Sequence, residues 1–332
     1  MKPNYSILEL ARFIDRTQKD FDDSYVNIYF FGGEPSLEYE KIIQLIDKIK
    51  ELLSSKYIVN FVLHTNGLLL NNTPIKVLEN LSLIMFSINY EKIPHYQLAP
   101  GYFSSIILNA IQIRNTTNIA QIARLTITEK TSLYTEILQV LPFFDLVYWQ
   151  IENCEKFNDF ESFYKSYTFE IQVTFEYWLN ALRKGNLIKL VPFMAVLKFM
   201  FYHDRNDHEF SCGYSKGMIY VQTNGACFAC SDNVESGCHF VGSIAQGVKF
   251  KKISLLDLRC KACIYRSICM GRCGRMHKEF SAAHISEYCK LNQYMFNLFL
   301  AKKDELKDII ENQPKIKEEL SNPLLEFTEF TP

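Results

Sequence analysis

The sequence predicts an α/β protein whose first half folds around a parallel sheet and whose second half holds a small cysteine-rich region. In the first half, short apolar runs rich in β-branched and aromatic residues alternate with helical patterns, as expected of βαβ units. Five such units suit a partial barrel or a doubly wound sheet, and in both folds the loops at the carboxyl ends of the strands build the site. In the second half, nine of the ten cysteines lie between Cys212 and Cys289, which calls for a chemical cause.

The expected strands of the first half are Val26 to Phe31, Tyr57 to Leu63, Leu83 to Ile88, Ile119 to Ile127 and Phe143 to Ile151. The helical patterns cover residues 6–18, 39–53, 74–80, 102–115 and 132–141. Ser6 is placed to cap the first helix, because Glu9 follows three residues later and completes the capping-box pattern. Without another strand before it, the run at Val26 becomes an exposed apolar edge of the sheet, which is an aggregation liability unless something covers it.

The rest of the chain gives local signals and predicts a division into four domains. Residues 157–184 predict an aromatic-rich helical segment, and Asn224-Gly225 between two short runs predicts a β-hairpin from Gly217 to Cys230. A charged helix is expected from Ala301 to Leu320, with Asn322-Pro323 ending it. The expected domains are an α/β domain at residues 1–155, a helical bridge at 156–205, a cysteine-rich domain at 206–300 and a helix and tail at 301–332.

Composition predicts a cytoplasmic protein and excludes some classes of partner. The 332 residues are 48% hydrophobic and 22% charged, which is ordinary for a globular protein. A net charge of −1 leaves no field that would attract nucleic acid or an anionic membrane. We see no signal-peptide h-region and no apolar run of membrane-spanning length. Because thiols stay reduced in the cytosol, the clustered cysteines predict a metal site rather than disulfides.

One run of the chain supplies four closely spaced thiols: Cys260, Cys263, Cys269 and Cys273. Close spacing lets a short loop provide several thiolate ligands to a soft metal without strain. The last cysteine of the run lies on a following turn and points to a second centre, as in iron–sulfur proteins where one cysteine of a run ligates the other cluster. Cys212 and Cys230 bracket the predicted hairpin and are candidates to join that second centre.

A zinc ribbon is the alternative, since it also uses paired Cys-x-x-Cys elements. Its four ligands would be Cys227, Cys230, Cys260 and Cys263. This assignment gives no role to Cys212, Cys269, Cys273 and Cys289. The spacing therefore favours iron–sulfur over zinc, and a zinc-stabilised interaction protein stays as an alternative interpretation.

The cysteine pattern resembles the SPASM domain, the carboxyl-terminal extension of many radical S-adenosylmethionine (radical SAM) enzymes, among them peptide maturases and anaerobic sulfatase-maturing enzymes. The matching residues are Cys212, Gly225, Cys230, Cys260, Cys263, Cys269, Cys273 and Cys289. The resemblance implies two auxiliary 4Fe–4S clusters. The ligands it implies are Cys260, Cys263, Cys269 and Cys289 for one cluster, and Cys212, Cys230 and Cys273 for the other. For the fourth ligand of the second cluster, Cys227, Cys238 and a position open to substrate are the alternatives.

The first half resembles the radical SAM core, a partial (βα)6 barrel. Gly32-Gly33-Glu34-Pro35 matches the family's GGEP motif after its second strand, which receives the amino end of SAM, and Thr65-Asn66-Gly67 matches the motif after its third strand. Ser87-Ile88-Asn89 lies where the family often has Ser-Leu-Asp, and Arg124 on the following strand occupies a usual cofactor-contact position. Taken singly, each is also a common turn or surface charge. The cofactor-binding residues implied are Gly32, Gly33, Glu34, Thr65, Asn66, Ser87 and Arg124.

The chain departs from the family at its defining element, a Cys-x-x-x-Cys-x-x-Cys loop after the first strand that binds the SAM-cleaving cluster. No cysteine precedes Cys154, and one thiol cannot replace three ligands. The first barrel strand and the cluster loop would precede Met1, so we expect either a chain that begins late or a degenerate relative. As written, the chain is not expected to make a 5′-deoxyadenosyl radical, because the one-electron source for that step is absent.

The resemblance implies a function in the post-translational modification of a peptide or protein, such as the maturation of a ribosomal peptide. Asp232 is the candidate catalytic residue, because it lies near the position where sulfatase-maturing relatives carry a general base. The structural alternative is that Asp232 only closes a polar loop. The alternative function is a pseudo-enzyme that holds two clusters and presents a peptide, or passes electrons, to a partner maturase.

Overall fold

The computed structural model describes residues 3–20, 24–88, 101–202, 210, 212–214, 217–232, 234–250, 259–321 and 332. The chain divides into two compact units. The first unit contains residues 1–88, 94–123 and 215–252, and the second contains residues 89–93, 124–214 and 253–332.

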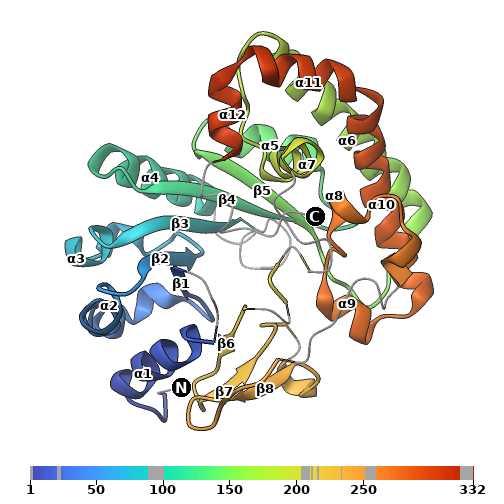
Figure 1. Cartoon of the computed structure of the whole chain (residues 1–332). Coiled ribbons are helices and arrows are strands. Elements are labelled where there is room, and N and C mark those ends of the chain that lie inside the picture. The colour runs from blue at the N-terminus through green and yellow to red at the C-terminus, as the bar shows by residue number, and fades with distance from the viewer. Residues whose placement is uncertain are drawn as a thin grey trace. The chain divides into compact units, whose positions relative to one another are not determined.

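A five-stranded sheet confirms the predicted α/β class (Figure 1). Its strands follow one another in the order β1 (Tyr25–Phe30), β2 (Ile58–Thr65), β3 (Leu81–Ile88), β4 (Ala120–Ile127) and β5 (Leu146–Ile151). The pairs β1–β2 and β2–β3 are parallel. The helices between consecutive strands are α2 (Tyr39–Leu53), α3 (Ile75–Leu78), α4 (Tyr102–Thr116) and α5 (Leu133–Val140).

The middle of the sheet is apolar on both faces. Four consecutive residues of β3, from Leu83 to Phe86, are buried although their side chains alternate between the faces of the sheet. Strands covered on both sides read as continuous apolar runs, which is why the sequence alone located them. At the edge of the sheet, β1 has β2 as its neighbour, and Tyr25 and Tyr29 are exposed. The predicted apolar edge strand is therefore present.

In the first unit, α1 (Ile7–Gln18) packs beside a small antiparallel sheet. This sheet consists of β6 (Tyr220–Val221), β7 (Ala226–Phe228), β8 (Phe240–Ser243) and β9 (Gly247–Val248). The predicted capping box at Ser6 and Glu9 is formed. Phe13 of α1 lies in an apolar cluster with Cys227 and Ile244. The β6–β7 pairing confirms the predicted hairpin.

The second unit is mainly helical. Its helices include α6 (Phe160–Arg183), α7 (Val191–Phe201), α8 (Arg266–Cys269), α9 (Gly274–Glu279), α10 (Ala282–Ala301), α11 (Lys303–Asn312) and α12 (Pro314–Leu320). An aromatic cluster joins three of them: Phe299 of α10 lies 4.8 Å from Phe175 of α6 and 5.3 Å from Phe193 of α7, measured between ring centroids. Burial of such large rings makes this cluster a major part of the core.

The prediction of a single helix from Ala301 to Leu320 is wrong. The structure has two helices, α11 and α12, with a break at Gln313. Pro314 explains the break, because proline has no N–H for the helix and disfavours helical backbone in the residue before it. Proline suits the first position of the next helix, where α12 begins. Leu306, Ile310 and Ile316 are buried, so both pieces pack on the protein.

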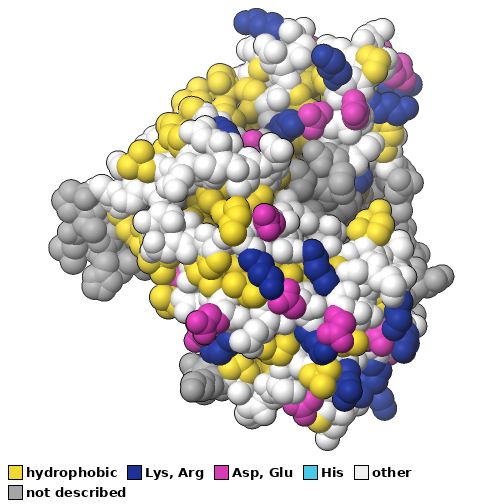
Figure 2. Space-filling model, turned by 90° about the vertical axis from the view of Figure 1, so that its left-hand side faces the viewer, with side chains coloured by type: hydrophobic (Ala, Val, Ile, Leu, Met, Phe, Trp, Pro, Cys, Tyr) yellow, Lys and Arg dark blue, Asp and Glu magenta, His cyan; other side chains and the backbone are white. Residues whose placement is uncertain are grey.

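Among the described residues, no helix is long and apolar enough to cross a membrane. On the face shown in Figure 2, Lys and Arg side chains lie among Asp and Glu side chains, with hydrophobic side chains between them.

Candidate functional site

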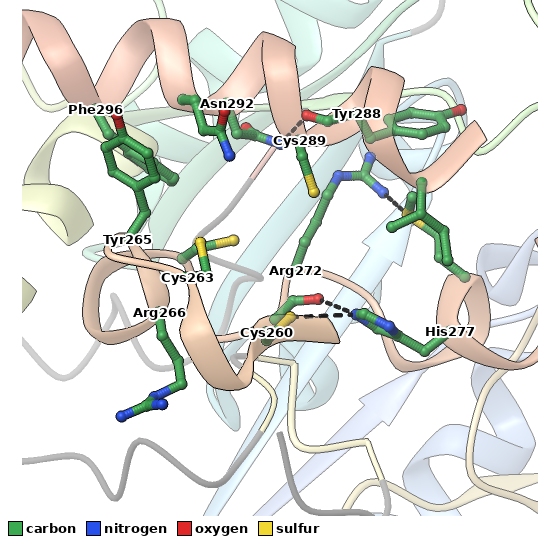
Figure 3. Close-up of a pocket in the computed structure, with 15 residues that line it drawn as sticks. Cys260, Cys263, Tyr265, Arg266, Arg272, His277, Tyr288, Cys289, Asn292 and Phe296 are labelled. Carbon is green, nitrogen blue, oxygen red and sulfur yellow. Dashed lines mark hydrogen bonds between the residues drawn. The ribbon is translucent and has the colours of Figure 1, made fainter. Parts of the chain in front are cut away.

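Four cysteines of the second unit line one pocket, which we call the thiol pocket. They are Cys260, Cys263, Cys269 and Cys289. The first three come from the 3-10 turn η5 (Arg259–Ala262), the residue after it and the end of α8, whereas Cys289 comes from α10. Figure 3 shows Cys263 and Cys289 on facing sides of the pocket, with Arg272 beside them. The structure thus brings together the four residues expected to hold one cluster.

Local interactions hold the cysteine loop against α10. Within the loop, the N–H of Cys263 donates to the carbonyl oxygen of Cys260 over 3.0 Å, and the N–H of Cys269 donates to that of Tyr265 over 2.8 Å. The Tyr265 hydroxyl donates to Asn297 Oδ1 of α10 over 2.7 Å. Helix α10 is itself fixed at its start, because the Ser281 side chain accepts the N–H of His284. The spacing of the thiols therefore rests on an anchored loop and a capped helix.

The thiol pocket suits a cationic occupant. Burial raises the pKa of Cys269, the neighbouring thiols of Cys289, Cys260 and Cys263 raise it further, and the charge of Arg272 opposes them. Burying several thiolates together costs free energy unless a metal neutralises their charge. Metal binding itself deprotonates the thiols. Within the described residues, no three Cys, His, Asp or Glu side chains converge closely enough to hold a single ion. The four sulfur donors instead surround a space, and this donor set fits an iron–sulfur cluster.

The residues expected to hold a second cluster are divided between the two units. Cys212 and Cys273 lie in the second unit and Cys230 in the first. Cys273 directly precedes α9, and Asn153 Nδ2 donates to its sulfur over 3.7 Å. The second cluster therefore stays a prediction.

The two candidates for a fourth ligand differ sharply in environment. Cys227 is fully buried in the apolar cluster of the first unit, and its thiol donates to the carbonyl oxygen of Gly225 over 3.8 Å. Burial raises the pKa of Cys227 to about 11. Cys238 is exposed. Because a buried neutral thiol behaves as a small hydrophobic residue, Cys227 acts as a core residue in this structure.

In the first unit, the Glu34 carboxylate ties together the turns that follow β1 and β2. Glu34 Oε1 accepts the N–H of Ser36 over 3.0 Å and the hydroxyl of Thr65 over 2.7 Å. Glu34 Oε2 accepts the N–H of Asn66 over 2.9 Å. The structure thus brings together the two motifs that the sequence placed at neighbouring strand ends.

Gly67 closes the second turn, where an added side chain would be strained and would crowd Phe86. The φ of Gly67 is +80°, and an added Cβ would lie 2.7 Å from Phe86 Cδ1. Asn109 Nδ2 of α4 donates to the Gly67 carbonyl oxygen over 2.8 Å and fixes the turn from the other side. Gly32 also has a left-handed φ, of +104°, in the turn after β1. Both motifs are therefore stiff, glycine-dependent turns.

Ser87 is hydrogen-bonded to a residue that the sequence reasoning missed. His64 Nε2 lies 2.6 Å from Ser87 Oγ, on the neighbouring strand. The ring of His64 lies 4.9 Å from that of Phe31, and Phe31 lies 6.2 Å from Tyr220. The position of His64 directly before Thr65-Asn66-Gly67 was a usable signal, whereas nothing in the sequence linked Tyr220 to this place.

Arg124, Asn89 and Asp232 complete the set of residues expected at the site. Arg124 lies on β4 in the second unit and stays a predicted cofactor contact. Asn89 lies outside the described residues. Asp232 is exposed in the turn after β7, and its catalytic role stays a prediction.

Comparison of residues 3–93 with protein families gives a match to a 4Fe-4S single cluster domain. The matched stretch contains no cysteine. The family likeness therefore follows the turns and strands of this region, and the sulfur ligands of such a cluster are not in it.

Solved structures share the fold. The structure titled "Native anSMEcpe with bound AdoMet" has a TM-score of 0.69 and 18% identity, and the likeness covers 93% of this chain and 91% of that chain. The same protein with bound AdoMet and the Cp18Cys peptide has a TM-score of 0.69 and 17% identity, with the same coverage. SuiB of Streptococcus suis bound to S-adenosylmethionine has a TM-score of 0.53 and 15% identity, covering 81% of this chain and 66% of that one.

These likenesses confirm the predicted α/β fold followed by a cysteine-rich carboxyl-terminal region. Comparison with curated proteins gives no match.

Proposed function

We propose that this chain is an iron–sulfur protein of the radical SAM/SPASM type that takes part in modifying a peptide. The thiol pocket carries the proposal, since four cysteines from two separate segments line one space in the second unit. The peptide substrate is supported by the solved structure of the same fold that is titled with a bound peptide.

When bound, 4Fe–4S clusters supply one-electron chemistry. The cysteines of the thiol pocket would hold one auxiliary cluster. Cys212, Cys230 and Cys273 would hold the second, with Cys238 or an open position as its fourth ligand. Asp232 would take a proton as general base. The exposed position of Asp232 leaves it accessible to a substrate.

The turn residues of the first unit are suited to the amino end of S-adenosylmethionine. Three hydrogen bonds from the chain occupy the Glu34 carboxylate, and an ionised carboxylate has about four lone-pair positions. One position is thus available for an ammonium group. Gly32 and Gly33 beside it have no side chain to block the approach. Ser87 and Arg124 complete the proposed cofactor contacts.

Anaerobic reconstitution with iron and sulfide, followed by iron and sulfide analysis, tests the proposal. We expect about eight iron atoms per chain, as two four-iron clusters require. The C289A variant should lose about half of this iron, because it removes a ligand of the thiol pocket. C227A is the matched control and should keep the full amount, since that thiol lies in the apolar core. Zinc in place of iron, or equal loss in both variants, would contradict the proposal.

A second candidate function is a pseudo-enzyme that serves a partner maturase or electron donor. The absence of cysteine from residues 3–93 favours it. The same reconstituted sample, reduced with dithionite and given S-adenosylmethionine, tests this second candidate. 5′-Deoxyadenosine above a no-protein control would contradict the pseudo-enzyme. Its absence from fully loaded protein fits the pseudo-enzyme and equally a chain that begins late.

A further inference from the structure

Arg272 is a buried cation at the wall of the thiol pocket. The residue is 8% exposed and lines the pocket together with the four cysteines. It follows α8 in a left-handed conformation, with φ of 57°, as does Met270, with φ of 51°. Left-handed backbone is uncommon for residues other than glycine and costs free energy. The turn that places Arg272 between Cys269 and Cys273 is thus held by its contacts.

The guanidinium group of Arg272 is held by two main-chain oxygens, a thioether and an aromatic ring. Nη2 donates to the carbonyl oxygen of Ile151 over 3.1 Å, and Nε donates to the main-chain oxygen of Pro332 over 2.6 Å. Nη1 also contacts the thioether of Met276, and the group lies over the Tyr288 ring, 4.4 Å from its centroid. Within the described part of the chain, no Asp or Glu side chain pairs with Arg272. A buried charge is stabilised by groups of opposite sign, and the cysteines that line the same pocket would bring negative charge beside Arg272 when they ligate a metal as thiolates.

Asn153 extends this arrangement to Cys273. Arg272 Nη1 donates to Asn153 Oδ1 over 2.8 Å. With its oxygen fixed in this way, the Asn153 amide turns its Nδ2 to the sulfur of Cys273, 3.7 Å away. One guanidinium group therefore faces the thiol pocket and also orients the donor to a cysteine outside it.

We propose that Arg272 sets the reduction potentials of both auxiliary clusters, directly at the thiol pocket and through Asn153 at Cys273. The inference rests on the proposed function, in which these cysteines hold clusters. Reduction adds one electron to an already anionic group, so a fixed positive charge and an N–H donor to sulfur stabilise the reduced form. Net charge and hydrogen bonds to the sulfurs are established determinants of cluster potential. Arg272 and Asn153 are positioning residues in this account.

The test is a redox titration of the reconstituted protein, with dithionite as the electron donor and electron paramagnetic resonance to follow each reduced cluster. In R272M we expect the ratio of oxidised to reduced cluster at a fixed potential to rise about tenfold for both clusters, which is a midpoint about 59 mV lower. R272K keeps the charge and should stay closer to wild type at the thiol pocket. N153A should shift only the cluster bound by Cys273.

R275M is the matched control. Arg275 lies three residues away, and its Nε donates to Glu279 Oε2 over 2.8 Å. It does not line the thiol pocket. The loss of this arginine should leave both midpoints unchanged.

The outcomes separate this inference from the proposed function. Clusters that load normally in R272M with wild-type midpoints would overturn the role of Arg272. A wild-type chain that takes up no iron would refute the proposed function instead. If R272M does not take up iron, the midpoint potentials of R272K and N153A test the proposal instead. An unchanged midpoint of the cluster bound by Cys273 in N153A would count against it.

Discussion

At the scale of single residues, the same side-chain type serves opposite purposes in this chain. Cys269 lies among other thiols in the thiol pocket, whereas Cys227 lies against Phe13 and Ile244 in an apolar cluster. Spacing in the sequence could not separate these roles, because Cys227 and Cys230 read as a plausible Cys-x-x-Cys pair. The environment of Cys227 is set by its contact with Phe13 of α1, a helix that is remote in the sequence.

The buried thiol of Cys227 makes a prediction about stability and pH. Its pKa is raised from 9.0 to about 11 by burial, so the folded state favours the neutral thiol. The stabilisation is complete below pH 9 and is lost as the pH rises towards 11. We expect the free energy of unfolding of the wild type to fall across this window relative to that of C227A, by about 1 kcal/mol or more. Urea denaturation at several pH values measures the difference, and parallel curves would contradict it.

At the scale of elements, regular patterns were predictable and interruptions less so. The predicted helix at 39–53 coincides with α2, because its apolar positions repeat at helical spacing. The tail helix was misjudged at Pro314, although the residue type itself carried the signal. Helix α10, which supplies Cys289, was not predicted, although its buried residues Ile285, Leu291 and Met295 recur at helical spacing.

The turn after β2 makes the second prediction. In G67A, the new Cβ would lie 2.7 Å from Phe86 Cδ1 on a backbone with φ of +80°. We expect the free energy of unfolding to fall by about 3 kcal/mol, from backbone strain and overpacking together. G247A is the control, since Gly247 has a φ of +82° but no atom within 4 Å of the added Cβ. It should lose only the strain, about 1–2 kcal/mol. Equal losses in the two variants would show that the contact with Phe86 is unimportant.

The sequence predicted which residues form the candidate site but not which of their side chains contact one another. The four cysteines of the thiol pocket and the turns at Glu34 and Thr65 could be predicted, because most of these residues belong to motifs whose members lie close together in the sequence. It gave no sign of the Arg272–Asn153 contact or of His64 beside Ser87. These pairs join residues from different elements, and one sequence without its fold does not reveal which elements are neighbours.

At the scale of the whole molecule, the fold is shared with solved structures titled with bound AdoMet, and nine of the ten cysteines of the chain lie between Cys212 and Cys289. The first unit keeps the stiff glycine turns, and the second keeps the thiol pocket. This combination is what the proposed auxiliary-cluster protein requires. The central claim of the proposed function is that iron occupies the thiol pocket.

Anomalous diffraction from anaerobically grown crystals of the reconstituted protein tests that claim most directly. Data collected just above and just below the iron absorption edge locate iron by difference. We predict a strong iron peak enclosed by Cys260, Cys263, Cys269 and Cys289. Anomalous signal at the zinc edge in this pocket, or iron bound elsewhere with the four cysteines unligated, would contradict the account.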